Sequence, residues 1–297
     1  MKHPSYGLPY CGSKTSIVDW LFANIPPAEY FVDLFCGGGS VTHAALLSGN
    51  YTHFIMNDRL PTAQYFIDCI NGGCNLEEPR AFVNKETFNR LKTEDMCVRL
   101  CYSFSNNGVD YCYSKAVAPY KEVLHKTVFG TGNADELAEI LKQSVYLPPS
   151  AVEPAYRWAM IKEQLPAEKL KNTPMKELRL PHYERLCRCA ALQKLKPVLD
   201  AYPVDTYCKD YTEIEIPDNA VVYCDIPYQN TRQTAYGKFD HERFVEWLQE
   251  ARKHHKIYIS EYNPPVPDCK CIAETSRFVT CNYYEHKHMT EYLYLID

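Results

Sequence analysis

Short apolar runs separated by helical patterns are the feature that most constrains how this 297-residue chain can fold. The runs are rich in β-branched and aromatic side chains, which is typical of β-strands. Several are almost entirely apolar, as central parallel strands covered on both faces usually are. The expected strands are Tyr30–Phe35, His53–Asn57, Ala220–Cys224, Lys256–Ser260, Arg277–Asn282 and Glu291–Ile296.

Helical patterns adjoin these runs in the order that βαβ units require. Ser40–Ser48 follows the first run after a glycine-rich turn, and Phe239–His254 precedes the fourth. The last two runs are separated only by a short polar link, so we expect them to form an antiparallel hairpin at one edge. The sequence therefore predicts an α/β fold with a mostly parallel sheet.

Between residues 61 and 202 helical patterns dominate. They cover 62–71, 85–95, 134–143, 155–162 and 183–195. We therefore expect two domains, a sheet domain made of residues 1–60 and 203–297 and a mostly helical insertion made of residues 61–202. Part of this insertion is basic, because Arg157–Lys196 contains ten Lys and Arg against four Glu in a chain whose net charge is −5. A basic patch on an acidic body suits a polyanionic partner. A solvated helix face with i,i+4 charge pairs would give the same sequence pattern.

The composition bears on the compartment of the protein. No stretch approaches the roughly 18 uninterrupted apolar residues that a membrane helix needs, and the N-terminus lacks the apolar region of a signal peptide. The fourteen cysteines include no Cys-x-x-Cys pair, so reduced thiols are favoured over a zinc site. We expect a cytoplasmic protein without a metal and without membrane contact.

The glycine-rich turn favours a nucleoside ligand. Asp33 lies in the first strand, Gly37–Gly39 form the turn, and Asp58 lies nineteen residues after the last glycine. A carboxylate at about that distance is well placed to hold ribose hydroxyls. The third glycine of a dinucleotide motif is missing, and Asp33 would repel a pyrophosphate but attract an ammonium. An adenosyl ligand with a cationic amino-acid tail is therefore favoured, with a purely structural turn as the alternative.

A second candidate site follows the strand run Ala220–Cys224. In open α/β sheets, ligands bind beyond the carboxyl ends of the strands. Asp225 and the carbonyl of Ile226 could accept the two hydrogens of a planar amino group, while Tyr228 stacks on the ring that carries it. The alternative is an ordinary Asp-X-Pro turn.

Taken together, the motifs resemble those of the Dam-like DNA adenine N6-methyltransferases, which use S-adenosylmethionine. The resemblance spans nearly the whole chain and is loose in the insertion. Its motifs are Tyr10-Cys11-Gly12-Ser13-Lys14, Asp33-Leu34-Phe35-Cys36-Gly37-Gly38-Gly39, Asn57-Asp58-Arg59, Lys209-Asp210-Tyr211, Asp225-Ile226-Pro227-Tyr228 and Ser260-Glu261-Tyr262-Asn263.

This resemblance implies a Rossmann-like class I methyltransferase sheet with an inserted target-recognition domain. It implies that Tyr10 and Lys14 border the cofactor pocket, and that Asp33, Phe35, Gly37 and Gly39 surround the methionine portion. Asp58 would hold the ribose, and Asp210 with Tyr211 would meet the adenine. Asp225, Ile226, Pro227 and Tyr228 would be catalytic. Ile226 departs from the usual proline, but only a backbone carbonyl is expected of that position.

The loop Ser103–Gly108 in the insertion offers amide and aromatic groups for reading or replacing a base. The DNA-binding candidates are Asn106, Asn107, Tyr111, Arg185 and Arg188, and a plain Asn-Gly turn is the alternative for the loop. We expect a monomer that acts on double-stranded DNA. Two other functions stay open, namely N-methylation of RNA or of a protein glutamine, and binding of cofactor or nucleic acid without catalysis.

Overall fold

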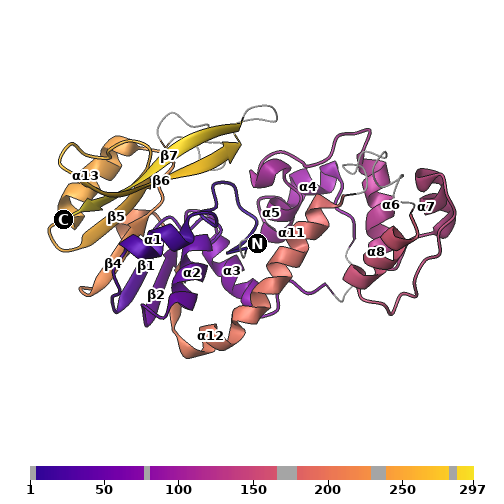
Figure 1. Ribbon diagram of the computed structural model, residues 1–297, viewed down its shortest axis with the longest axis horizontal. Helices are drawn as coiled ribbons and strands as arrows, with labels where there is room; N and C mark the ends of the chain where they lie inside the picture. The colour runs from indigo at the N-terminus through magenta and orange to yellow at the C-terminus, as the bar shows by residue number, and fades with distance from the viewer. Residues whose placement is uncertain (1–4, 77–80, 166–178, 229–238, 281–285) are drawn as a thin grey trace. The chain divides into compact units, whose positions relative to one another are not determined.

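The computed structural model describes residues 5–76, 81–165, 179–228, 239–280 and 286–297 (Figure 1). The chain divides into two compact units. The first unit consists of Met1–Asn71 and Leu192–Asp297, and the second of Gly72–Ala191. Helix α3 (Thr62–Ile70), which the sequence analysis assigned to the insertion, lies in the first unit.

The first unit is built on a sheet that, in the described residues, has seven strands in the order β3-β2-β1-β4-β5-β7-β6. The first five strands of the chain pair in parallel, and β7 is antiparallel to both of its neighbours. The strands are β1 (Tyr30–Asp33), β2 (His53–Asn57), β3 (Val204–Tyr207), β4 (Ala220–Cys224), β5 (Lys256–Glu261), β6 (Lys270–Thr280) and β7 (His286–Ile296). The predicted Rossmann-like α/β class and the edge hairpin are confirmed.

Helices cover both faces of this sheet, which explains why the central strands are apolar throughout. Successive side chains of a strand point to opposite faces. Val32 of β1 belongs to the same buried cluster as Phe244 of α13 (His241–Ala251). The neighbouring Phe31 contacts Phe22 of α1 (Val18–Asn24) instead, with 5.8 Å between the ring centroids. Three further helices of this unit are α2 (Ser40–Ser48), α3 and α12 (Lys196–Ala201).

The second unit is helical, and the sequence itself marks several helix starts. Asn84 and Asp95 each accept a hydrogen bond from a backbone N–H of the first helical turn that follows. The helix predicted over 85–95 therefore ends earlier, at Leu91, and Asp95 caps a separate helix that begins at Met96. In the described residues of this unit, the helices are α4 (Lys85–Leu91), α5 (Met96–Cys101), α6 (Ala118–Val128), α7 (Ala134–Leu141), α8 (Pro154–Glu163) and α11 (Pro181–Ala190).

A buried polar network stands at the centre of the second unit. His182 is fully buried, and its two ring nitrogens lie 2.5 Å from the Tyr113 hydroxyl and 3.0 Å from Nδ1 of His125. Burial holds the pKa of His182 well below its ordinary value, so the ring is neutral. No helix in the part of the chain that the structure describes is both long and apolar enough to cross a membrane.

Candidate active site

The glycine turn after β1 has a backbone that only glycine adopts without strain. Gly37 and Gly39 have φ values of 50° and 69°, in the left-handed region. A Cβ atom added to Gly38 would lie 2.5 Å from the Cβ of Tyr10. Tyr10 therefore covers the turn so closely that a side chain at Gly38 is excluded. The structure thus brings together Tyr10 and the glycines, all of which the resemblance assigns to cofactor binding.

Asp33, at the end of β1, is a buried acid with an unused oxygen. Its Oδ2 accepts a hydrogen bond of 2.7 Å from the Thr42 hydroxyl. Its Oδ1 is buried and has no hydrogen-bond partner among the described residues. Burial, with smaller contributions from the nearby Asp225 and Asp58 carboxylates, raises the pKa of Asp33 to about 7. A buried carboxylate with a vacant oxygen suits a cationic group such as an ammonium.

Asp58 follows β2 and binds the backbone of the glycine turn. Its Oδ2 accepts from the backbone N–H of Gly37 at 2.9 Å, and its Oδ1 accepts from that of Leu60 at 2.9 Å. The preceding Asn57 donates to the carbonyl of Leu34 and exchanges two hydrogen bonds with the backbone of Lys209. These hydrogen bonds thus connect the carboxyl ends of β1, β2 and β3.

Asp210 and Tyr211 sit at this same edge, each with protein partners. Asp210 accepts two hydrogen bonds from the Arg243 guanidinium, at 2.9 and 3.1 Å, and caps a short 3-10 helix through Thr212. Tyr211 is buried among aromatic rings that include Phe35, at 5.3 Å between centroids. The sequence did not indicate Arg243, because it lies 33 residues from Asp210.

Asp225 lies directly after β4 and faces a buried lysine. Since β1 and β4 are parallel neighbours with Asp33 opposite Tyr223, Asp33 and Asp225 share one edge of the sheet. The Lys14 Nζ lies 2.6 Å from Oδ1 of Asp225, and the Lys14 side chain is only 3% exposed. The backbone N–H of Lys14 donates to the hydroxyl of Ser40 at the start of α2, which fixes the lysine beside the glycine turn. Lys14 and Asp225, expected in separate parts of the site, are in direct contact.

Two carboxylates to which the sequence analysis assigned no role, Glu261 and Glu291, complete the cluster around Lys14 and Asp225. The Tyr228 hydroxyl donates to Oε1 of Glu291 on β7 at 2.6 Å, and the Lys14 Nζ lies 3.3 Å from the same oxygen. Glu261 ends β5, and burial raises its pKa to about 7. The sequence offered one signal that these two residues have a function. Glu261 and Glu291 each lie within or beside an expected strand, and charged residues are rarely placed in a buried strand.

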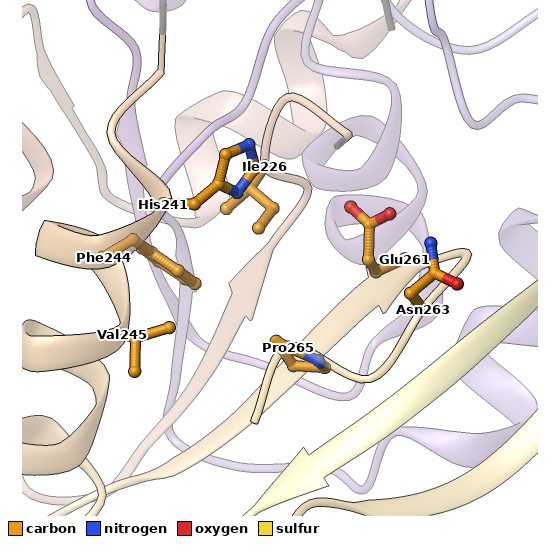
Figure 2. Close-up of a pocket in the computed structure, with 7 residues that line it drawn as sticks. All are labelled: Ile226, His241, Phe244, Val245, Glu261, Asn263 and Pro265. Carbon is orange, nitrogen blue, oxygen red and sulfur yellow. The ribbon is translucent and has the colours of Figure 1, made fainter. Parts of the chain in front are cut away.

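The tetrapeptide itself is largely enclosed. Ile226 and Tyr228 are 4% and 9% exposed, and the Tyr228 ring meets Tyr262 edge-on with 4.5 Å between centroids. Figure 2 shows the small pocket beside it, between α13 and the end of β5. Its lining residues are Ile226, His241, Phe244, Val245, Glu261, Asn263 and Pro265. Oε2 of Glu261 is buried there without a hydrogen bond to any described residue.

Most DNA-binding candidates of the second unit lie in one loop or contact it. Asn107 closes this loop on itself, since its Oδ1 accepts from the backbone N–H groups of Val109 and Asp110. Arg185 donates to the carbonyls of Cys101 and Ser103, at 2.7 and 2.8 Å. The Tyr111 hydroxyl donates to the carbonyl of Val83. These three side chains therefore stabilise the loop. The remaining candidates are Asn106, in the loop, and Arg188, a half-buried residue of α11 whose pKa burial lowers.

The loop is a strained turn rather than a plain hairpin. Ser103 and Tyr111 form an antiparallel bridge. Between them Ser105 and Asn106 have φ values of 48° and 59°, which is unusual for residues with side chains. Phe104 beside them is 49% exposed. The structure therefore displays an aromatic ring on a loop that several hydrogen bonds hold in an uncommon backbone conformation.

The fold and the cluster of carboxylates at the ends of its strands define a class of protein. A parallel sheet that ends in an antiparallel strand, with a glycine turn after β1, an acid after β2 and a polar tetrapeptide after β4, is the arrangement of the Rossmann-like class I methyltransferases. Asp33, Asp58 and Asp225 lie close enough for the other two to raise the pKa of Asp33. Among the described residues, this edge of the sheet thus brings Asp33, Asp58 and Asp225 together beside one buried ammonium, that of Lys14.

Comparison with known proteins agrees with this class. Residues 10–95 match the model of the D12 class N6 adenine-specific DNA methyltransferase family, which confirms the family resemblance for the stretch that holds the glycine turn and Asp58. No curated protein matches the chain. Among solved structures, SMU.472, described as a proposed methyltransferase in complex with SAH, is 11% identical with a TM-score of 0.28. That match covers 95% of this chain and 52% of the other, so the chain spans about half the length of that protein.

Proposed function

We propose that this protein transfers a methyl group from S-adenosylmethionine to the exocyclic amine of adenine in double-stranded DNA. The observation that carries the proposal is the adjacency of two motifs at one edge of the sheet. The glycine turn and the Asp225–Tyr228 tetrapeptide follow neighbouring parallel strands, and Lys14 contacts Asp225 while bonding to Ser40 of the turn. The family match over residues 10–95 supports the substrate class.

The residues of the glycine turn fit the proposed cofactor. The vacant Oδ1 of Asp33 would accept from its ammonium, and Asp58 would meet its ribose. Tyr10, Lys14, Phe35, Gly37 and Gly39 would border it. Asp210 and Tyr211 would lie at its adenine. When bound, S-adenosylmethionine supplies an electrophilic methyl group on a sulfonium. The carboxylates here favour a cation over a neutral ligand.

The tetrapeptide would hold the target base. The adenine amine is a poor nucleophile because its lone pair is delocalised into the ring. The Asp225 carboxylate and the Ile226 carbonyl would accept its two hydrogens and orient the nitrogen, while Pro227 shapes the turn between them and Tyr228. Positioning of this kind accounts for a large part of catalysis in group-transfer enzymes. A base inside a duplex cannot reach this site, so it must be flipped out, and stacking on Tyr228 would offset part of the lost stacking.

The second unit would supply DNA contacts through its strained loop. Phe104 is exposed and can stack on or replace a base, while Asn106 can bond to a base edge. Asn107, Tyr111 and Arg185 would act by holding the loop, and Arg188 would add positive charge on α11. The described residues contain thirteen cysteines as thiols, which supports a reducing cytoplasm, and we expect the enzyme to act as a monomer.

The distribution of a labelled methyl group tests this function. The protein is incubated with methyl-labelled S-adenosylmethionine and, in parallel, with unmethylated genomic DNA, total RNA and a protein extract. We expect label in N6-methyladenine of DNA. Label confined to RNA or protein, or cofactor binding without transfer to any of them, would overturn the proposal. Sequencing of the methylated DNA then identifies the target site.

A further inference from the structure

Glu291 is a fully buried carboxylate in the strand next to the outermost strand of the sheet. An apolar residue would be expected at such a buried position. Glu291 lies on β7, opposite Thr275 of β6, and its exposure is 0%. Burying a charge is unfavourable unless ion pairs and hydrogen bonds compensate for the lost hydration. Replacement of buried ion pairs by apolar residues often leaves stability unchanged or raised. Stability alone therefore does not explain this residue.

Two partners of Glu291 are residues of the proposed methyl-transfer site. Its Oε1 accepts from the Tyr228 hydroxyl at 2.6 Å and lies 3.3 Å from the Lys14 Nζ. That ammonium also lies 4.9 Å from the centre of the Tyr228 ring and 2.6 Å from Oδ1 of Asp225. One carboxylate oxygen thus links the aromatic ring and, through Lys14, the acid of the tetrapeptide.

We propose that Glu291 is a positioning residue for methyl transfer, which holds the Tyr228 ring and the Lys14 ammonium in a fixed geometry relative to Asp225. This inference rests on the proposed function. The hydroxyl anchor restricts rotation of the ring about its side-chain bonds. The shared ammonium fixes the Asp225 carboxylate relative to the ring plane. A flipped base would therefore meet an aromatic face and a hydrogen-bond acceptor that are already oriented.

The two ends of this link can be separated by substitution. Glu291→Ala removes both contacts, Glu291→Gln keeps an acceptor for the Tyr228 hydroxyl but not the charge, and Tyr228→Phe removes only the hydroxyl. Single-turnover methyl transfer to unmethylated genomic DNA is measured together with the cofactor Kd. Glu274→Gln is the matched control, because Glu274 is an exposed glutamate on the adjacent strand β6.

We expect Glu291→Ala to lower the single-turnover rate about tenfold. The cofactor Kd should stay within about twofold of wild type, since Lys14 keeps its ion pair with Asp225. Glu291→Gln should restore part of the rate. Tyr228→Phe combined with Glu291→Ala should be no slower than Glu291→Ala alone, because both changes break the same link.

Independent effects would overturn the inference. If the rate losses of Glu291→Ala and Tyr228→Phe multiply in the double variant, Glu291 does not act through Tyr228. If Glu291→Ala does not fold, unchanged rates in both Glu291→Gln and Tyr228→Phe would contradict the proposal as well. Failure of the wild-type protein to methylate any substrate would instead refute the proposed function, so the two failures are distinguishable.

Discussion

Oδ2 of Asp58 accepts a 2.9 Å hydrogen bond from the backbone N–H of Gly37, which joins the end of β2 to the glycine turn after β1. The same carboxylate accepts from the N–H of Leu60 through its other oxygen. The residue expected to hold a ribose is therefore also the residue that shapes the turn beneath it. Cofactor affinity and the stability of the first unit should both depend on this side chain.

Replacement of Asp58 by alanine tests that dual role. The change leaves the N–H groups of Gly37 and Leu60 without their acceptors, so we expect the free energy of unfolding to fall by about 1–3 kcal/mol. Asp58→Asn should lie between wild type and alanine, because its amide has one acceptor oxygen. Chemical denaturation measures the effect, and Asp68→Ala, at an exposed position of α3, serves as the control. Equal stability of Asp58→Ala and wild type would contradict the structural role.

Cofactor binding should weaken as the pH falls through 7. The folded-state pKa of Asp33 is about 7, above its ordinary 3.8, because burial disfavours the charged form. Between these two values the folded protein holds a proton that the unfolded chain has lost, so Asp33 lowers stability progressively as the pH rises toward 7. A cationic ligand requires the ionised form, which gains population over the same range.

Calorimetric titration with S-adenosylmethionine measures this linkage. We expect the Kd to rise about tenfold from pH 8 to pH 6, since about a tenth of Asp33 is ionised one unit below its pKa. Glu261, whose pKa is also about 7, can steepen the dependence. Asp33→Asn should bind more weakly at pH 8 and with a flatter pH profile. A profile as steep as that of wild type would rule out Asp33 as the ligand group.

Stability of the second unit should fall below pH 6.5. His182 is neutral when folded because burial, with His125, Arg185 and Lys121 nearby, lowers its pKa below the ordinary 6.5. Because the folded-state pKa of His182 is lowered, the contribution of this residue to stability is fully present above pH 6.5. That contribution is lost as the pH falls below 6.5, where the unfolded chain takes up the proton. The free energy of unfolding then falls by up to about 1.4 kcal/mol for each pH unit.

Denaturation monitored between pH 5 and 7.5 checks this expectation. His182→Gln should be less stable than wild type at pH 7.5 and should lose most of the pH dependence. The control His254→Gln changes an exposed histidine and should retain it. Stability of the wild type that is constant across the range would show that His182 remains accessible to protons when folded.

The sheet was largely predictable because its central strands are buried on both faces and read as unbroken apolar runs. Strand β3 was missed, since Val204–Tyr207 is short and only partly buried at the edge. Helix α6 was missed too, because polar residues such as Lys121, His125 and Thr127 are among its buried positions and blur the apolar pattern. The start of α5 was missed as well, because the helical pattern of 85–95 includes Asp95, which is the N-cap residue of α5.

The site was predictable where local motifs supply it and unpredictable where the fold brings distant residues together. Asp33, Gly37 and Asp58 follow from the strand, turn and strand around them. The contact between Lys14 and Asp225 joins residues 211 positions apart, and Glu291 lies 63 positions from the Tyr228 hydroxyl that it accepts from. No periodicity in a single sequence encodes such pairs.

Methyl transfer by Asp225→Asn, compared with Asp205→Asn, tests the central claim most directly. Asparagine keeps the shape of Asp225 but loses a charged acceptor, whereas Asp205 is an exposed residue of β3. With labelled S-adenosylmethionine and unmethylated DNA, we predict that Asp225→Asn lowers the rate of N6-methyladenine formation at least about a hundredfold. Asp205→Asn should match wild type, and both variants should unfold at the wild-type temperature within a few degrees. Undiminished methylation by a folded Asp225→Asn protein would contradict the account.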